Sequence, residues 1–133
     1  MALKIIEKQL KTIDNIFKLK REGDYFCIGE FPTKKGSRFE KFEALNFYLN
    51  FPTNYPFSAP SISFVPFIFH PNINNFSELV LQDFFKEDWC PAININSLLN
   101  TIWSIIDDPV RDCPVNELAS EFWDDENEYN FLI

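Results

Sequence analysis

The sequence has few of the residues that build metal centres, disulfide scaffolds or membrane spans. It holds three cysteines and one histidine in 133 residues, and no two cysteines form a C-x-x-C pair. An odd number of widely spaced cysteines fits a reducing compartment better than a secreted disulfide framework, and too few clustered ligands are left for a structural zinc. No apolar run reaches the ~18 residues that a membrane span needs. We therefore expect no metal, no cofactor and no membrane span.

Basic residues are also in deficit. The chain has 12 Lys and Arg against 20 Asp and Glu, a net charge of −8. An acidic chain repels phosphate backbones, so we do not expect it to bind nucleic acid. What the chain has in excess is aromatic side chains, which make up 17% of it and include 16 Phe. A chain of this length and composition predicts one compact domain over residues 1–133 rather than long disorder.

The first part of the chain carries a helical pattern. Residues 1–21 have a net charge of +4, and apolar residues recur there at helical spacing: Leu3, Ile6, Leu10, Ile13 and Phe17. The pattern predicts a first helix packed on the domain with its lysines in solvent. An organelle-targeting helix is the alternative, but Glu7, Asp14 and the scarcity of Arg and Ser count against it.

Strand patterns follow. Apolar and polar residues alternate over residues 45–51 and 61–64, and residues 24–31 read as a preceding strand. Residues 32–38, with Gly36, are expected to form a turn, and the proline-dense run 52–60 is expected to link strands. Residues 66–91 show no clear periodicity. A stretch of that length in a small domain indicates a functional loop.

Two further helices are expected. Asn96 or Ser97 can cap a buried helix that continues to Asp107–Pro109, and a last helix is expected from Pro114. The apolar face of that last helix is predicted to comprise Leu118, Ala119, Phe122 and Trp123. The order of elements predicts an α+β fold in which helices are segregated from an antiparallel meander.

Several ordered motifs resemble the landmarks of the ubiquitin-conjugating enzyme family, over about residues 3–129. They are Tyr55-Pro56-Phe57, Ala59-Pro60, Phe69-His70-Pro71-Asn72-Ile73-Asn74, Trp89-Cys90-Pro91-Ala92 and Asp108-Pro109. The resemblance implies a four-stranded antiparallel meander with an N-terminal helix, a central buried helix and a C-terminal helix, and a long loop around the active-site groove. Relatives commonly continue into a further helix, so with the sequence ending at Ile133 we expect the final family helix to be missing.

The resemblance also implies a reaction that this chain lacks the residue to perform. The family carries its cargo as a thioester on a cysteine about eight positions after the Asn of His-Pro-Asn, because a thiolate is both nucleophile and leaving group. Eight positions after Asn72 stands Val80, and eight before Trp89 stands Leu81. Neither is a nucleophile, which favours a pseudoenzyme. Cys113 also stands before Pro114, where many relatives have an acidic residue that helps to receive the amine's proton.

The remaining motif residues have a structural interpretation. In active relatives the Asn of His-Pro-Asn supports the oxyanion or the loop and the His braces the turn. Here we interpret His70, Pro71 and Asn72 as a vestigial, rigid corner, since Pro followed by Asn builds a turn without catalysis. The alternative to a pseudoenzyme is an active enzyme in which Cys90 has taken over the role of nucleophile.

The resemblance also implies binding surfaces, which do not require the missing cysteine. Phe64 matches one ligase-contacting loop and Trp89, Pro91 and Ala92 match the second, although Phe64 can equally be a core residue. At the other end, the resemblance leaves apolar surface uncovered around Phe131, Leu132 and Ile133. Exposed apolar surface of this kind favours a chain that works in a complex.

Three hypotheses about function follow. The first is a non-catalytic scaffold or accessory subunit, with protein partners such as ubiquitin, a ubiquitin-like protein, an active conjugating enzyme or subunits of a larger complex. The second is a structural subunit of an assembly unrelated to ubiquitin transfer. The third is an active conjugating enzyme that uses Cys90. A cytoplasmic or nuclear location follows from the family alone, with an organelle-associated complex as the alternative.

Overall fold

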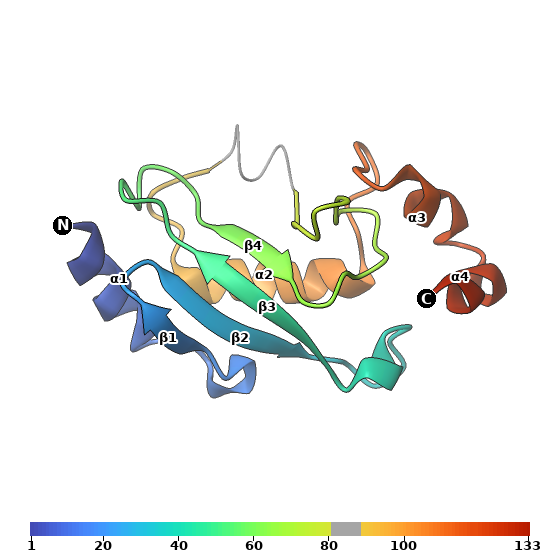
Figure 1. The fold of residues 1–133 in the computed structure, drawn as a ribbon, viewed down its shortest axis with the longest axis horizontal. Coiled ribbons are helices and arrows are strands. Elements are labelled where there is room, and N and C mark those ends of the chain that lie inside the picture. Colours follow the sequence, from blue (N-terminus) through green and yellow to red (C-terminus); the bar gives the residue numbers. More distant parts are fainter. Residues whose placement is uncertain (81–88) are drawn as a thin grey trace.

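The computed structural model describes residues 1–80 and 89–133, and its architecture is an α+β arrangement of one sheet with helices on one face and at both ends (Figure 1). Helix α1 (Ala2–Leu10) and a short 3-10 helix (Asn15–Phe17) precede the strands. The strands are β1 (Lys20–Gly23), β2 (Phe26–Pro32), β3 (Ala44–Asn50) and β4 (Ser61–Phe64), and a second 3-10 helix (Glu40–Phe42) lies between β2 and β3. Helices α2 (Ile95–Asp107), α3 (Glu117–Phe122) and α4 (Glu126–Leu132) complete the fold.

The sheet is the four-stranded antiparallel meander that the resemblance implies, in the order β1-β2-β3-β4. In β3 the residues Leu45, Phe47 and Leu49 are buried while their neighbours face solvent, as the alternating pattern predicts. The strand β1 was not predicted from periodicity, because its sequence Lys-Arg-Glu-Gly is exposed along its whole length. Gly36 has a φ of 86° in the connection after β2, which confirms the predicted turn.

Helix α2 supplies most of the core opposite the sheet. Its six buried residues include Leu98, Leu99 and Ile102, and Figure 1 shows the helix lying behind β3 and β4. The cap was predicted wrongly. The N-cap is Asn94, whose side chain accepts a hydrogen bond from the Ser97 amide at 2.8 Å, while the Asn96 side chain accepts one from the backbone of Asp14 at 2.9 Å.

The first helix is shorter than its apolar periodicity predicts. It ends at Leu10, and Thr12 turns the chain by bonding back to the Gln9 carbonyl. Asp14 then caps the 3-10 helix by accepting from the Ile16 amide, an arrangement that short polar side chains favour over continued helix. Ile6 and Phe17 are nevertheless fully buried, so the apolar stripe reaches the core through two helices rather than one.

The predicted last helix is also divided into two. Pro114 lies before α3 rather than in its first turn, and Asn116 is the N-cap. Of the predicted apolar face, Ala119 and Trp123 are buried, whereas Leu118 is 50% exposed. Figure 1 places α3 and α4 at the end of the molecule opposite α1. None of the helices in residues 1–80 and 89–133 has the length and apolar character that a membrane crossing requires.

Candidate functional site

The corner formed by His70, Pro71 and Asn72 is buried, and it is hydrogen-bonded to α2, to the loop after α2 and to the start of α3. His70 is fully buried, and its Nε2 lies 3.0 Å and 3.1 Å from the carbonyl oxygens of Ile105 and Ile106 at the end of α2. Its Nδ1 accepts a hydrogen bond from the Asn72 amide at 3.0 Å, so Nε2 carries the proton and donates to the carbonyls. Burial lowers the pKa of His70 to about 4. The imidazole is therefore a neutral brace between the corner and α2.

The side chain of Asn72 is paired with one backbone residue. Its Nδ2 donates to the Val110 carbonyl at 2.8 Å, and its Oδ1 accepts from the Val110 amide at 3.0 Å. Asn72 is 1% exposed. This amide therefore holds the loop after α2 against the corner, with one of its two Nδ2 hydrogens donated to the Val110 carbonyl.

The same loop is held a second time by Pro71. The Pro71 carbonyl accepts from the amides of Val115 at 2.9 Å and Asn116 at 3.1 Å. This pairing brings the segment that contains Cys113 alongside the corner. The corner therefore joins three separate parts of the chain: the segment after β4, the end of α2 and the start of α3.

A tight loop leads from the corner to Val80. The Asn74 side chain accepts from the amides of Phe76 and Glu78, which closes the turn. The chain then runs back beside β4, with hydrogen bonds from Phe64 to Ser77 and from Leu79 to Ile62. Val80 donates its backbone amide to the Asn72 carbonyl at 2.8 Å, and its side chain is half-buried. Position 80 therefore lies directly beside the corner and presents a hydrocarbon side chain. Leu81, the second candidate position, lies outside the described residues.

The three cysteines differ in their surroundings. Cys27 is fully buried in β2, and burial raises its pKa to about 11, so its thiol is unreactive. Cys90 and Cys113 are exposed and free. Within residues 1–80 and 89–133, no group of three or more His, Cys, Asp or Glu side chains is arranged to hold a metal ion.

The predicted ligase-facing surface needs one correction. Phe64 is 2% exposed and lies 6.0 Å from the Phe31 ring, so it is a core residue and not part of a surface patch. Trp89 is half-buried: its indole nitrogen donates to the Pro56 carbonyl at 2.8 Å. Pro91 and Ala92 are exposed.

Sequence reasoning missed the aromatic residue that lies exposed near this loop. Phe57 is 63% exposed, and the bond from Trp89 to Pro56 holds its segment against the segment that leads to Pro91 and Ala92. A signal was available in the sequence, because Phe57 stands in the proline-dense link between strands whereas Phe64 stands in an alternating strand. We refer to Phe57, Pro91 and Ala92 as the loop patch.

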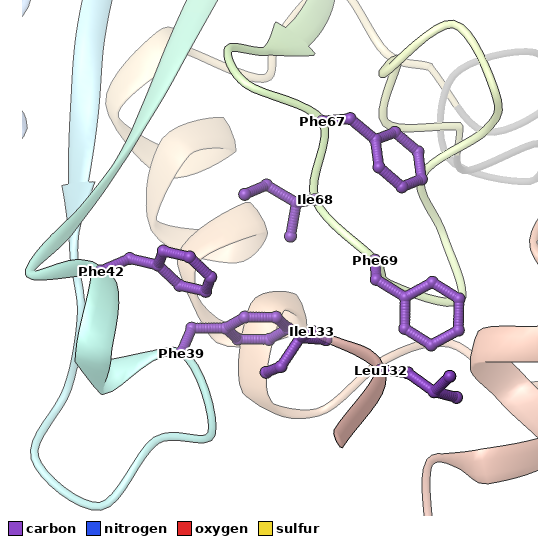
Figure 2. A pocket seen from close by; sticks show the side chains of 7 residues that line it. All are labelled: Phe39, Phe42, Phe67, Ile68, Phe69, Leu132 and Ile133. Atoms are coloured by element: carbon purple, nitrogen blue, oxygen red, sulfur yellow. The ribbon is translucent and has the colours of Figure 1, made fainter. Parts of the chain in front are cut away.

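At the other end, Phe131 is 84% exposed and Leu132 is 40% exposed, whereas Ile133, also expected to be uncovered, is half-buried. Leu132 and Ile133 line an apolar pocket (Figure 2) together with residues of the second 3-10 helix and of the segment before His70. No pattern in the sequence predicts this pocket, since its walls come from three distant segments.

A four-stranded antiparallel meander backed by one central helix, with a buried His-Pro-Asn corner beside the half-buried Val80, defines the class of fold. Residues 9–132 match the model of the family described as ubiquitin-conjugating enzyme. The chain therefore belongs to the ubiquitin-conjugating enzyme family, and members of this family bind protein partners.

Proposed function

We propose that this protein is a non-catalytic member of the family that acts as a binding scaffold or accessory subunit. The observation that carries the proposal is the identity of positions 80 and 81. Val80, eight positions after Asn72, and Leu81, eight before Trp89, stand where the family's cargo-carrying cysteine is expected, and the Val80 amide bonds to the Asn72 carbonyl. Neither a valine nor a leucine side chain has a lone pair with which to form a thioester.

The bonding of the corner matches the bracing role that the His and Asn of this motif also have in active relatives. The polar atoms of His70 and Asn72 all bond to backbone groups of the protein itself. A neutral histidine with a pKa of about 4 does not act as a general acid near pH 7, because it holds no second proton there. The corner therefore has the bonding of a structural element.

We propose the loop patch as the surface that contacts a protein partner. Phe57, Pro91 and Ala92 are exposed, apolar and held together by the bond from Trp89 to Pro56. Rigid aromatic anchors of this kind dominate binding energy at protein interfaces. The proposed partners are ubiquitin, a ubiquitin-like protein or an active conjugating enzyme.

A loading assay tests the absence of catalysis. The purified protein is incubated with a ubiquitin-activating enzyme, ATP, magnesium and ubiquitin, beside an active conjugating enzyme as the positive control. We expect no thiol-labile conjugate on this protein by non-reducing electrophoresis. A thiol-labile conjugate that disappears in Cys90→Ser would instead establish the enzyme hypothesis, and loss in Cys113→Ser would place the nucleophile in the loop beside the corner.

A titration tests the binding role. The isotope-labelled protein is titrated with ubiquitin, a panel of ubiquitin-like proteins and an active conjugating enzyme, and amide shifts are followed by NMR. We expect at least one partner to bind, with affinity reduced about tenfold in Phe57→Ser. Phe76→Ser is the matched control, since Phe76 is 80% exposed and lies outside the loop patch. Binding to none of the panel rejects ubiquitin-related partners and leaves the unrelated structural subunit.

A further inference from the structure

An apolar pocket of about 170 Å³ lies at the end of the molecule opposite α1. Figure 2 shows its walls: Phe39 and Phe42 on one side, Phe67 and Phe69 on the other, and the two C-terminal residues below. The lining residues are Phe39, Phe42, Phe67, Ile68, Phe69, Leu132 and Ile133, and none of their side chains carries a polar atom. Any occupant is therefore held by apolar contact rather than by side-chain hydrogen bonds.

The size of the pocket limits what it can hold. A protein cavity of about 150 Å³ lined by Leu, Ile and Phe accepts one benzene molecule, whereas pockets for drug-sized ligands measure about 300–1,000 Å³. A pocket of about 170 Å³ thus fits one aromatic ring or one leucine side chain. Such a pocket suits a single anchor residue of a larger partner.

The rim of the pocket leaves apolar surface for that partner to cover. Phe67 is 47% exposed, Phe42 is 39% exposed and Leu132 is 40% exposed. Phe131, the neighbour of Leu132 in α4, is 84% exposed. Exposed apolar residues around an anchor pocket are typical of a protein interface.

The charge around the pocket indicates which residues a partner should carry next to its anchor side chain. The three lining segments 39–43, 67–69 and 126–133 contain four carboxylates and one cation, Lys41. Residues 112–133 contain seven carboxylates and no Lys or Arg. Lys41 lies 5.2 Å from the centre of the Phe42 ring and Arg38 lies 3.5 Å from that of Trp123. Arg38 also lines a neighbouring hollow with Lys34, Lys35, Asp107 and Glu126. With these groups included, residues 34–43, Asp107 and residues 124–128 hold four cations and seven carboxylates, so the region stays acidic. The surroundings of the pocket therefore favour a basic partner and repel an acidic one.

A second copy of this chain fits the pocket less well. A symmetric pair would bring the two acidic rims face to face, which like charges oppose. The basic helix α1 has its apolar residues Ala2 and Ile6 in its own core, and its exposed lysines could reach the rim of another copy only in a head-to-tail contact, which does not form a closed pair. A separate protein with basic residues around an apolar anchor avoids both difficulties.

We propose that this pocket binds one aromatic or leucine side chain of a partner protein segment, with lysine or arginine residues on either side of that anchor. This inference extends the proposed function, because it assigns the binding module a second partner class at a site distant from the loop patch. It does not depend on the identity of position 80.

The test uses a blocked synthetic peptide in which lysine pairs flank a central phenylalanine. We expect amide shifts in residues 67–69 and in α4 during an NMR titration of the full chain, and binding that weakens as salt is added. Changing the peptide's phenylalanine to alanine should abolish binding, and replacing its lysines by glutamates should weaken binding about tenfold or more.

Variants of the protein locate the site. Phe67→Ser and Leu132→Ser, from two different segments that line the pocket, should each weaken peptide binding about tenfold. Phe76→Ser should leave it unchanged, and the NMR spectrum of each variant reports whether it is folded. Equal binding of the glutamate-flanked peptide, or wild-type binding by both pocket variants, would overturn the inference. So would a dimer of the protein alone that Phe67→Ser dissociates, since a second copy would then be the occupant. The loading assay and the Phe57 titration remain separate readouts, so failure here is distinguishable from failure of the proposed function.

Discussion

The His70–Asn72 corner and the apolar pocket lie next to each other along the chain and have opposite character. In the corner, His70 and Asn72 are almost fully buried, and their side chains bond to backbone groups of the corner itself, of α2 and of the loop that follows α2. In the pocket, three residues away, Phe67 is half exposed. The corner thus has its polar groups paired within the chain, whereas the pocket exposes apolar surface that another protein can cover. The first determines stability, and the second is where we expect binding.

The largest expected effect distinguishes a core phenylalanine from a surface one. Phe64→Ala should lower the free energy of unfolding by about 3–5 kcal/mol, because Phe64 is 2% exposed and its removal leaves a cavity. Phe57→Ala, at a residue that is 63% exposed, should change it by no more than about 0.5 kcal/mol. Urea unfolding followed by tryptophan fluorescence measures both. Similar losses for the two variants would mean that Phe57 is a core residue and would remove it from the loop patch.

The second prediction concerns the amide of Asn72. Asn72→Ala should destabilise the protein by about 2–3 kcal/mol, because it removes both hydrogen bonds to Val110 and leaves those backbone groups without their partner. Asn75→Ala is the matched control at an exposed position three residues away and should have little effect. Denaturant unfolding of the two variants is the measurement. A loss confined to partner binding, with stability unchanged, would contradict a structural role for the corner.

The third prediction is a loss of stability in acid caused by His70. Its pKa is about 4 in the folded protein and about 6.5 when exposed, so the unfolded state binds the proton more readily. The contribution of the neutral imidazole is complete above pH 6.5 and is lost as the pH falls toward 4. At pH 5 this loss amounts to about 2 kcal/mol relative to neutral pH.

Two measurements check this assignment. His70→Gln keeps a donor for the α2 carbonyls without titrating in this range, so its stability should change less between pH 7 and pH 5 than that of the unmodified protein. The chain has one histidine, so its imidazole proton signal in the NMR spectrum is unambiguous. A titration midpoint near 6.5 in the folded protein would contradict the buried, bonded state of His70.

The sheet and the central helix were predictable because their signals are local. Alternation in residues 45–51 and 61–64 identified β3 and β4, and the apolar run after residue 97 identified α2. The cap was missed because Asn94, Asn96 and Ser97 are all good caps by type, and only the contact of Asn96 with the Asp14 backbone removes it from that role.

The sites were less predictable because they depend on contacts between distant segments. The motif located the corner, but the pairing of Asn72 with Val110, 38 residues later, follows from the fold. Phe57 and Phe64 are both phenylalanines near prolines, and their burial differs because one lies in a connection and the other in a strand. The pocket unites residues 39–42, 67–69 and 132–133, which no pattern in the sequence associates.

The smallest expected effect concerns the loop after α2, which is bonded to the buried Asn72 on one side and to the exposed Asp124 on the other. Outside the corner, Arg111 donates to the Ser120 carbonyl at 2.8 Å and pairs with Asp124 at 3.3 Å, where the Asp124 side chain is 81% exposed. Asp124→Asn should therefore lower the free energy of unfolding by at most about 0.5 kcal/mol, and added salt should reduce the difference, because exposed ion pairs are screened. The same urea unfolding assay that serves Asn72→Ala measures it. If Asp124→Asn costs as much as Asn72→Ala, the loop is held from its exposed side, and the corner is not the region that determines its position.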